Sequence, residues 1–236
     1  MTCSARIPRG LHTGALCWLI EGDDGLVLVD TGLGQADYVR RSAILRAFQI
    51  ATILPFDPEQ AAVRQIRRLG YGPADVRHIV LTHLHFDHAG GVPDFPDATV
   101  HLHRREFEAF TGKRHHWLNL AYVRRHLAHG PRLVLYETVS DRWFRFPAVR
   151  LPLAPEMWLV PLFGHTPGHC GVAIRMGDVW YLHAGDAVSP GPVAHVPDWV
   201  ERLVLGPHGP RLRAFADAHP DILITAGHMP LDAFEG

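Results

Sequence analysis

Short apolar runs, each about the length of a β-strand, recur along this chain between glycine, proline and polar turns. Near the start, two β-rich runs flank an Asp-Gly turn at residues 24–25, a pattern that predicts a hairpin ending at residues 30–32. Further runs of this kind include residues 78–83, 98–103 and 156–162. Because many of the predicted strands are consecutive, we expect sheets that pack against one another.

Apolar residues at helical spacing occupy several segments between these strands. Residues 38–48 have this spacing, and Asp57 is a candidate N-cap for a second helix that Gly70 ends. We expect further helices over 104–110 and 210–219, and an amphipathic helix over 115–127 on an insertion. Strands mixed with flanking helices predict an α/β fold, and the lack of repeats or linkers favours a single domain over residues 1–236.

The composition is that of an ordinary globular protein, since 47% of the 236 residues are hydrophobic and 20% are charged. A net charge of −1 argues against nucleic-acid binding. No apolar run approaches the roughly 20 residues that span a membrane, and three distant cysteines fit a reducing compartment. Because no signal-peptide cleavage pattern follows the apolar residues 11–20, we expect a cytoplasmic protein, monomeric or homodimeric.

The candidate chemistry concentrates in the sequence LTHLHFDHAGG at residues 81–91. In a chain that extends out of a strand, His83, His85 and Asp87 point to the same side, and a helix starting there turns His88 beside them. Imidazole and carboxylate groups together suit zinc, manganese or iron. The spacing therefore predicts a metal site at this loop.

A metal site needs further ligands from distant parts of the chain. Three later segments each deliver histidine or aspartate from a strand-like run into a glycine-rich turn, where the backbone turns sharply. These segments offer His165 and His169, then Asp186, and finally His228. With the first cluster they supply enough ligands for two metal ions that share a bridging carboxylate and a bridging hydroxide.

A second HLH sequence, at His101 and His103, lacks these features. Arg104 and Arg105 follow it in place of a carboxylate, and no glycine turn presents the pair. We therefore expect these two histidines to belong to an ordinary strand face. His183 alternates on a predicted strand, and we expect it to pack beside the ligands rather than bind metal.

Five motifs of this chain resemble those of the metallo-β-lactamase superfamily in kind and order. They are VDTG at 29–32, THLHFDH at 82–88, GHTPGH at 164–169, GD at 185–186 and GH at 227–228. The resemblance covers essentially the whole chain. It implies the metallo-β-lactamase fold, a four-layer αββα sandwich of mixed sheets with helices outside, and a site at the rim between the sheets.

The same resemblance implies a role for each motif residue. One metal ion is expected at His83, His85 and His165. A second ion is expected at Asp87, His88 and His228, with Asp186 bridging the two. Asp30 and His169 are expected to orient the ligands through hydrogen bonds. The implied cofactors are two divalent ions, zinc first, with iron or manganese as alternatives.

Within the superfamily, LTHLHFDHAGG after GY-x-P-x-D-V most resembles the N-acyl-homoserine lactonase-like branch. Those lactonases usually carry a tyrosine three residues after the bridging aspartate, whereas this chain has Ser189, a candidate substrate contact. The implied reaction is hydrolysis of a small-molecule carbonyl ester, with a lactone first, by a hydroxide between the two ions. Asp87 is the candidate catalytic residue, because it can hold the nucleophile's proton and pass it to the leaving group.

The sequence also fits other interpretations. A glyoxalase II-like thioesterase shares the ligands, and a single-iron oxygenase of the persulfide dioxygenase type shares similar motifs. The apolar side chains of the 115–127 insertion either line an approach for an acyl chain or simply belong to the core. Arg124 or Arg125 is a candidate contact for an anionic substrate group.

Overall fold

The computed structural model describes residues 2–6, 12–52, 57–112, 117–137, 141–188 and 198–230. Its first large sheet has five strands in the order β3-β4-β5-β6-β7. These strands are β3 (Trp18–Gly22), β4 (Gly25–Val29), β5 (Val76–Val80), β6 (Thr99–His103) and β7 (Arg132–Tyr136). The predicted hairpin forms the antiparallel pair β3–β4, and the remaining neighbours pair in parallel.

The second large sheet has five strands in the order β10-β11-β12-β13-β14. They are β10 (Val149–Leu151), β11 (Met157–Pro161), β12 (Cys170–Met176), β13 (Val179–His183) and β14 (Leu223–Thr225). All its neighbours are antiparallel except β13 and β14. The turn at residues 177–178 joins β12 to β13, as the Gly-Asp pair predicts.

Two small sheets complete the strand content of the described residues. One contains β1 (Thr2–Arg6), β2 (His12–Leu16) and β15 (His228–Pro230), and the other contains β8 (Arg142–Trp143) and β9 (Phe146–Pro147). Because β15 pairs with β2, the C-terminal part of the described chain returns to the N-terminal part. This pairing fixes the backbone at His228.

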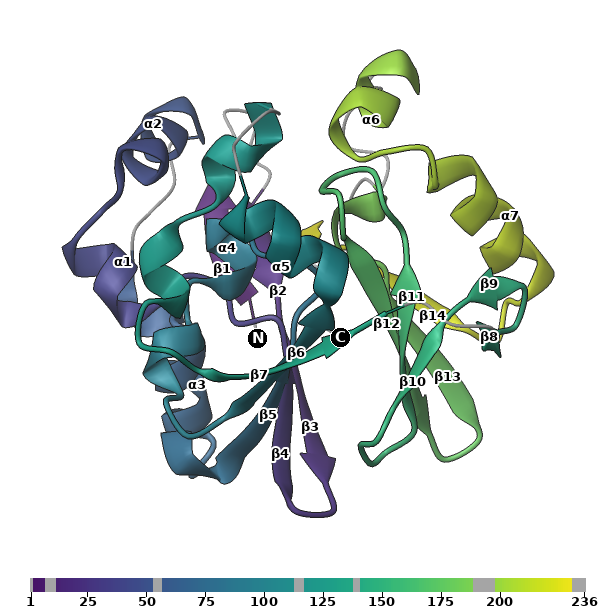
Figure 1. Cartoon of the computed structure of the whole chain (residues 1–236), viewed down its shortest axis with the longest axis horizontal. Helices are drawn as coiled ribbons and strands as arrows, with labels where there is room; N and C mark the ends of the chain where they lie inside the picture. Colours follow the sequence, from purple (N-terminus) through teal and green to yellow (C-terminus); the bar gives the residue numbers. More distant parts are fainter. Residues whose placement is uncertain are drawn as a thin grey trace.

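The helices accompany the two large sheets on different sides of the molecule (Figure 1). With the first sheet lie α1 (Gln35–Val39), α2 (Ala43–Thr52), α3 (Ala62–Arg68), α4 (Phe86–Ala89) and α5 (Arg104–Thr111). With the second sheet lie α6 (Asp198–Val204) and α7 (Gly209–Ala218). The described part of the chain also forms six short 3₁₀ turns: η1 (Pro58–Gln60), η2 (Pro73–Asp75), η3 (Val92–Asp94), η4 (Trp117–Ala121), η5 (Arg124–Leu127) and η6 (Gly185–Ala187). Among the described residues, no helix is long and apolar enough to cross a membrane.

Strand alternation explains how the layers form. In the LVLV run of β4, Leu26 and Leu28 pack on one side in a core that includes Ile66 of α3. Val27 and Val29 point to the opposite side and join a core with strands of the second sheet. A third core buries Phe215 of α7 against the outer face of that sheet. The order of layers is therefore helix, sheet, sheet, helix.

Three helix predictions need correction. Asp57 caps the 3₁₀ turn η1, and α3 begins only at Ala62, after Ala61, which makes no side-chain cap bond. The helix expected over 38–48 is two helices, α1 and α2, separated at residues 40–42. The Ser42 hydroxyl accepts a hydrogen bond from the backbone N–H of Leu45, so it starts a new helix where the apolar spacing alone suggests continuity. In place of a helix over 115–127 the described residues form the 3₁₀ turns η4 and η5, and residues 115–116 lie outside the described part.

Candidate metal centre

The first histidine cluster lies directly after β5, the middle strand of the first sheet. His83 and His85 occupy the extended segment behind this strand, and α4 begins at Phe86, so Asp87 and His88 lie in its first turn. Backbone hydrogen bonds attach this loop to its neighbours, as when the N–H of Thr31 donates to the carbonyl of His88 at 2.7 Å. The alternation expected from the sequence therefore places the four side chains on one side of a well-anchored loop.

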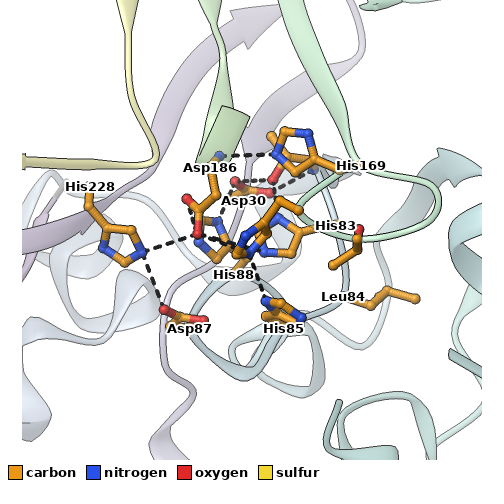
Figure 2. A network of polar contacts seen from close by, with 12 residues as sticks. Asp30, His83, Leu84, His85, Asp87, His88, His169, Asp186 and His228 are labelled. Carbon is orange, nitrogen blue, oxygen red and sulfur yellow. Dashed lines mark hydrogen bonds and ion pairs between the residues drawn. The ribbon is translucent and has the colours of Figure 1, made fainter. Parts of the chain in front are cut away.

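The distant candidates reach the same point from three other connections, and Figure 2 shows two of them, Asp186 and His228, beside the first cluster. His165 lies between β11 and β12, Asp186 lies in η6 directly after β13, and His228 opens β15. Three sets of side chains have ligand atoms within 4.8 Å of one another: His83, His85 and His165; His83, His88 and Asp186; Asp87, His88 and His228. The structure thus brings together all seven residues expected to bind metal, and that they bind it stays a prediction.

Asp186 lies between the two histidine groups. Its Oδ2 atom is 3.3 Å from His165 Nε2 and 3.5 Å from His228 Nε2, while its Oδ1 atom is 3.4 Å from His88 Nε2. Figure 2 shows the carboxylate between His228 on one side and His83 on the other. Asp186 therefore lies within reach of both histidine groups, and its role as a shared ligand stays a prediction.

Asp30 sets the protonation of two of the histidines. Its carboxylate accepts hydrogen bonds from the Thr82 hydroxyl and from His88 Nδ1, both at 2.8 Å. Because the Thr82 proton points to Asp30, Thr82 Oγ1 accepts from His83 Nδ1 at 3.0 Å. In the neutral form both rings therefore carry their proton on Nδ1 and turn the Nε2 lone pair into the cluster, as metal ligands do. Burial lowers the pKa of His88, but Asp186 and Asp30 outweigh it and raise this pKa well above its ordinary value, so His88 has to release a proton before its Nε2 atom can bind a cation.

Unpartnered polar atoms show that this cluster fits a cation. The Nε2 atoms of His83 and His88 and the Oδ1 atom of Asp186 are buried at the cluster without a hydrogen-bond partner among the described residues. Buried polar atoms are almost always hydrogen-bonded, so three exceptions at one point call for an explanation. Nitrogen and oxygen donors of this kind suit zinc, manganese or iron.

The pKa shifts separate the two halves of the cluster. Burial lowers the pKa of His83 and His85 well below its ordinary value, helped by neighbouring histidines, so both rings are neutral. Burial also opposes charge on His228, but Asp186 and Asp87 outweigh it and raise the pKa to about 10. Burial raises the pKa of Asp87, but His228 and His88 outweigh it and lower it to about 2.

The cluster is buried on one side and open on the other. The side chains of His83 and His88 are 0% exposed, whereas those of His228 and Asp87 are 29% and 18% exposed. Gly227 leaves room for the carboxylate of Asp186 beside His228, since a Cβ there would lie 2.2 Å from Asp186 Oδ1. A substrate would therefore approach from the side of Asp87 and His228.

The residues expected to orient the ligands make such contacts. Asp30 bonds to His88 as described, and His169 Nε2 accepts the backbone N–H of Asp186 at 3.0 Å. His183 lies behind Asp30, with Nε2 at 3.4 Å from its Oδ2 atom, and belongs to none of the candidate ligand sets among the described residues. Ser189 lies outside the described residues.

The other candidate residues point elsewhere. His101 lies in β6, 2.8 Å from the Tyr136 hydroxyl, and His103 accepts the Arg105 N–H at the start of α5. Arg125 pairs with buried Asp37, and Arg124 donates to backbone carbonyls at residues 111 and 112. Neither arginine is thus placed to meet a substrate anion. Of the insertion's apolar residues, Tyr122 and Val123 are buried in the core.

Sequence reasoning missed two residues beside the cluster. The Thr82 hydroxyl donates a hydrogen bond to Asp30 and lies within hydrogen-bond distance of His83, so it connects the two side chains. Glu106 in α5 is a charged residue that is fully buried. A signal for Glu106 exists in the sequence: it lies four residues before Phe110 and so shares a helix face with a core residue. A charged group on an apolar helix face indicates a specific partner.

Comparison with known proteins identifies the family. Residues 12–228 match the sequence profile of the Metallo-beta-lactamase superfamily, so the chain belongs to this superfamily. The fold expected from the motifs, with mixed sheets and helices, is confirmed. A crystal structure of an N-acyl homoserine lactone hydrolase with N-hexanoyl-L-homoserine at its catalytic metal center has the same fold (TM-score 0.68, 24% identity, 95% of this chain and 84% of that chain).

Two curated proteins of known sequence are similar to this chain. A probable metallo-hydrolase of Mycobacterium tuberculosis is 42% identical over 72% of this chain and 55% of its own length. An N-acyl homoserine lactonase of Bacillus cereus is 31% identical over 70% of this chain and 60% of its own length. The matched part of the chain thus spans little more than half the length of these relatives.

Proposed function

We propose that this chain is a dinuclear metal-dependent hydrolase of carbonyl esters, with a lactone as its substrate. The observation that carries this proposal is the pair of ligand sets, one of His83, His85 and His165 and one of Asp87, His88 and His228, joined by Asp186. Two cations in adjacent sites are typical of hydrolytic centres. The match to a lactonase of Bacillus cereus supports the lactone as substrate class.

The two ligand sets differ in a way that suits two tasks. The set of His83, His85 and His165 contains only histidines, whereas that of Asp87, His88 and His228 includes a carboxylate. When bound, two divalent ions supply Lewis acidity for a carbonyl oxygen and lower the pKa of water to about 7. The protein contributes fixed ligand positions, because Asp30, Thr82 and His169 hold the ligands by hydrogen bonds.

Asp87 is proposed as the residue that moves the proton. It is a carboxylate on the open side of the cluster, 3.3 Å from His228 Nε2. It accepts the proton that the attacking water loses. It then returns this proton to the oxygen of the departing alcohol, so that one water and one ester give one acid and one alcohol.

The test is proton release in a pH-stat by metal-analysed protein. The panel contains acyl-homoserine lactones of several chain lengths, simple γ- and δ-lactones, aryl esters and S-acyl-glutathiones. Asp87→Asn should lower kcat by about 100-fold or more while KM changes little, since general acid–base catalysis contributes about 10²- to 10⁴-fold. Asp94→Asn is the matched control, because Asp94 accepts bonds from Gln35 outside the cluster.

Each outcome discriminates between the candidate functions. Lactone turnover that Asp87→Asn removes and Asp94→Asn retains supports the proposal. Turnover of thioesters alone would favour the glyoxalase II-like alternative. One iron per chain with oxygen consumption would favour the persulfide dioxygenase type. Full activity of Asp87→Asn would refute the role of Asp87.

A further inference from the structure

Glu106 is a buried carboxylate that makes its contacts behind the candidate metal ligands. Its residue is 0% exposed, and it belongs to the first turn of α5. Its Oε1 atom accepts the backbone N–H of Leu84 and the hydroxyl of Tyr122, both at 2.9 Å. Its Oε2 atom accepts the hydroxyl of Thr166 at 2.6 Å and the backbone N–H of Gly168 at 3.0 Å.

The donors come from the segments that carry three of the histidines. Leu84 stands between His83 and His85, and Thr166 follows His165 directly. The Tyr122 ring lies 5.3 Å from that of His85, and its backbone pairs with His85 through an isolated β-bridge. One carboxylate therefore connects the loop after β5, the loop between β11 and β12, and the segment around residue 122.

Close packing makes this connection rigid. A Cβ added to Gly168 would lie 2.1 Å from the backbone N and 2.5 Å from the Cα of Glu106, so α5 begins directly against the loop that holds His165. The two carboxylate oxygens accept four hydrogen bonds and need no donor of their own. An amide at this position would turn an NH₂ group toward two donors.

We propose that Glu106 is a positioning residue that holds the loop of His83 and His85 at a fixed distance from His165. It thereby supports the metal subsite of these three histidines and not the other subsite. The other subsite depends on Asp87 and His228 and takes no bond from Glu106 among the described residues. This inference rests on the proposed function, because it presupposes that the cluster binds two cations.

The test uses Co²⁺ as the probe, with the metal-free full chain titrated against a chromogenic chelator and followed by its visible absorption spectrum. Single variants His165→Ala and His228→Ala assign the two affinities and the two sets of bands, since each histidine belongs to one ligand set only. In Glu106→Gln, Co²⁺ binding at the His83–His85–His165 subsite should weaken by about 10- to 100-fold, with altered bands. Binding at the other subsite should stay within about threefold of the wild-type value.

Asp37→Asn is the matched control, since Asp37 is also a buried carboxylate and pairs with His126 and Gly34 rather than with a candidate ligand or with a partner of Glu106. It should leave both affinities unchanged. If Glu106→Gln does not fold, Tyr122→Phe and Thr166→Val each remove one of the four bonds and should each weaken the same subsite. Unchanged binding in the variants, equal weakening of both subsites, or the same effect in Asp37→Asn would overturn the proposal.

The readout separates this inference from the proposed function. Wild-type protein that binds two Co²⁺ ions but hydrolyses no lactone refutes the substrate class and leaves the test of Glu106 intact. Wild-type protein that binds no metal refutes the proposed function and the role of Glu106 together.

Discussion

Replacement of Asp30 by asparagine tests how the buried network controls the metal subsite of His88. Asp30 is 1% exposed and has a positive φ of 54°, a conformation that asparagine also tolerates. The substitution therefore keeps shape and backbone, and it changes the hydrogen bonds and removes the negative charge of the carboxylate. One oxygen can still accept the Thr82 N–H, which lies at 2.8 Å. The NH₂ group of the asparagine then takes the place of Oδ2 and cannot accept the hydrogen bonds from His88 and the Thr82 hydroxyl.

The expected loss of metal affinity follows from the hydrogen bond that the asparagine amide cannot make. His88 Nδ1 donates to Asp30 Oδ2 at 2.8 Å, and this bond keeps the Nε2 lone pair of His88 available. A hydrogen bond to a charged group contributes about 1.5–3 kcal/mol. Loss of about 2 kcal/mol corresponds to about 30-fold, since 1.36 kcal/mol is tenfold. We therefore expect Co²⁺ to bind the Asp87–His88–His228 subsite about 30-fold more weakly.

The assay is the same chelator competition, with bands assigned through His228→Ala. Asp30→Asn should weaken the Asp87–His88–His228 subsite directly and the other subsite to a smaller extent through Thr82 and His83, whereas Glu106→Gln should weaken only the His83–His85–His165 subsite. Chemical denaturation reports how much of the lost bond energy appears in the stability of the metal-free protein. If Asp30→Asn bound both ions as tightly as wild type, the tautomer argument would be wrong.

Two further predictions concern stability. Because Asp186 and Asp87 raise the pKa of His228 to about 10 against an ordinary 6.5, the metal-free folded state holds this proton more tightly than the unfolded state. The stabilising effect of this proton is therefore complete below pH 6.5 and is lost as pH rises toward 10. The thermal unfolding midpoint of the metal-free protein, measured with a chelator present, should fall over this pH range, and it should fall less steeply in His228→Gln. The same pH dependence in both proteins would contradict this prediction. Gly168→Ala should destabilise by about 1–3 kcal/mol through overpacking against Glu106. Gly72→Ala, whose added Cβ would have 3.5 Å to its nearest neighbour, should not lower the unfolding midpoint comparably.

The local parts of the fold could be predicted from the sequence because they depend on neighbouring residues. The alternation in LVLV of β4 and the Asp-Gly turn before it act within a few positions. The cap at Asp57 also acts locally, although it begins the 3₁₀ turn η1 and not α3. The break at Ser42 and the 3₁₀ turns after residue 117 could not be predicted from apolar spacing. There a single cap and the packing of Tyr122 against Glu106 outweigh the helical pattern.

The sequence by itself also determined which side chains are candidate ligands, since histidine and aspartate beside glycine after a strand are recognisable locally. Only the tertiary structure decided which of them meet. His83 and His165 approach because parallel and antiparallel strands of two different sheets end at one rim, and His228 joins them through the pairing of β15 with β2. Glu106 shows the same limit, because its partners Leu84 and Gly168 become neighbours only when α5 packs between their loops. Contacts between residues so distant in the chain arise from burial and sheet pairing, which no local pattern encodes.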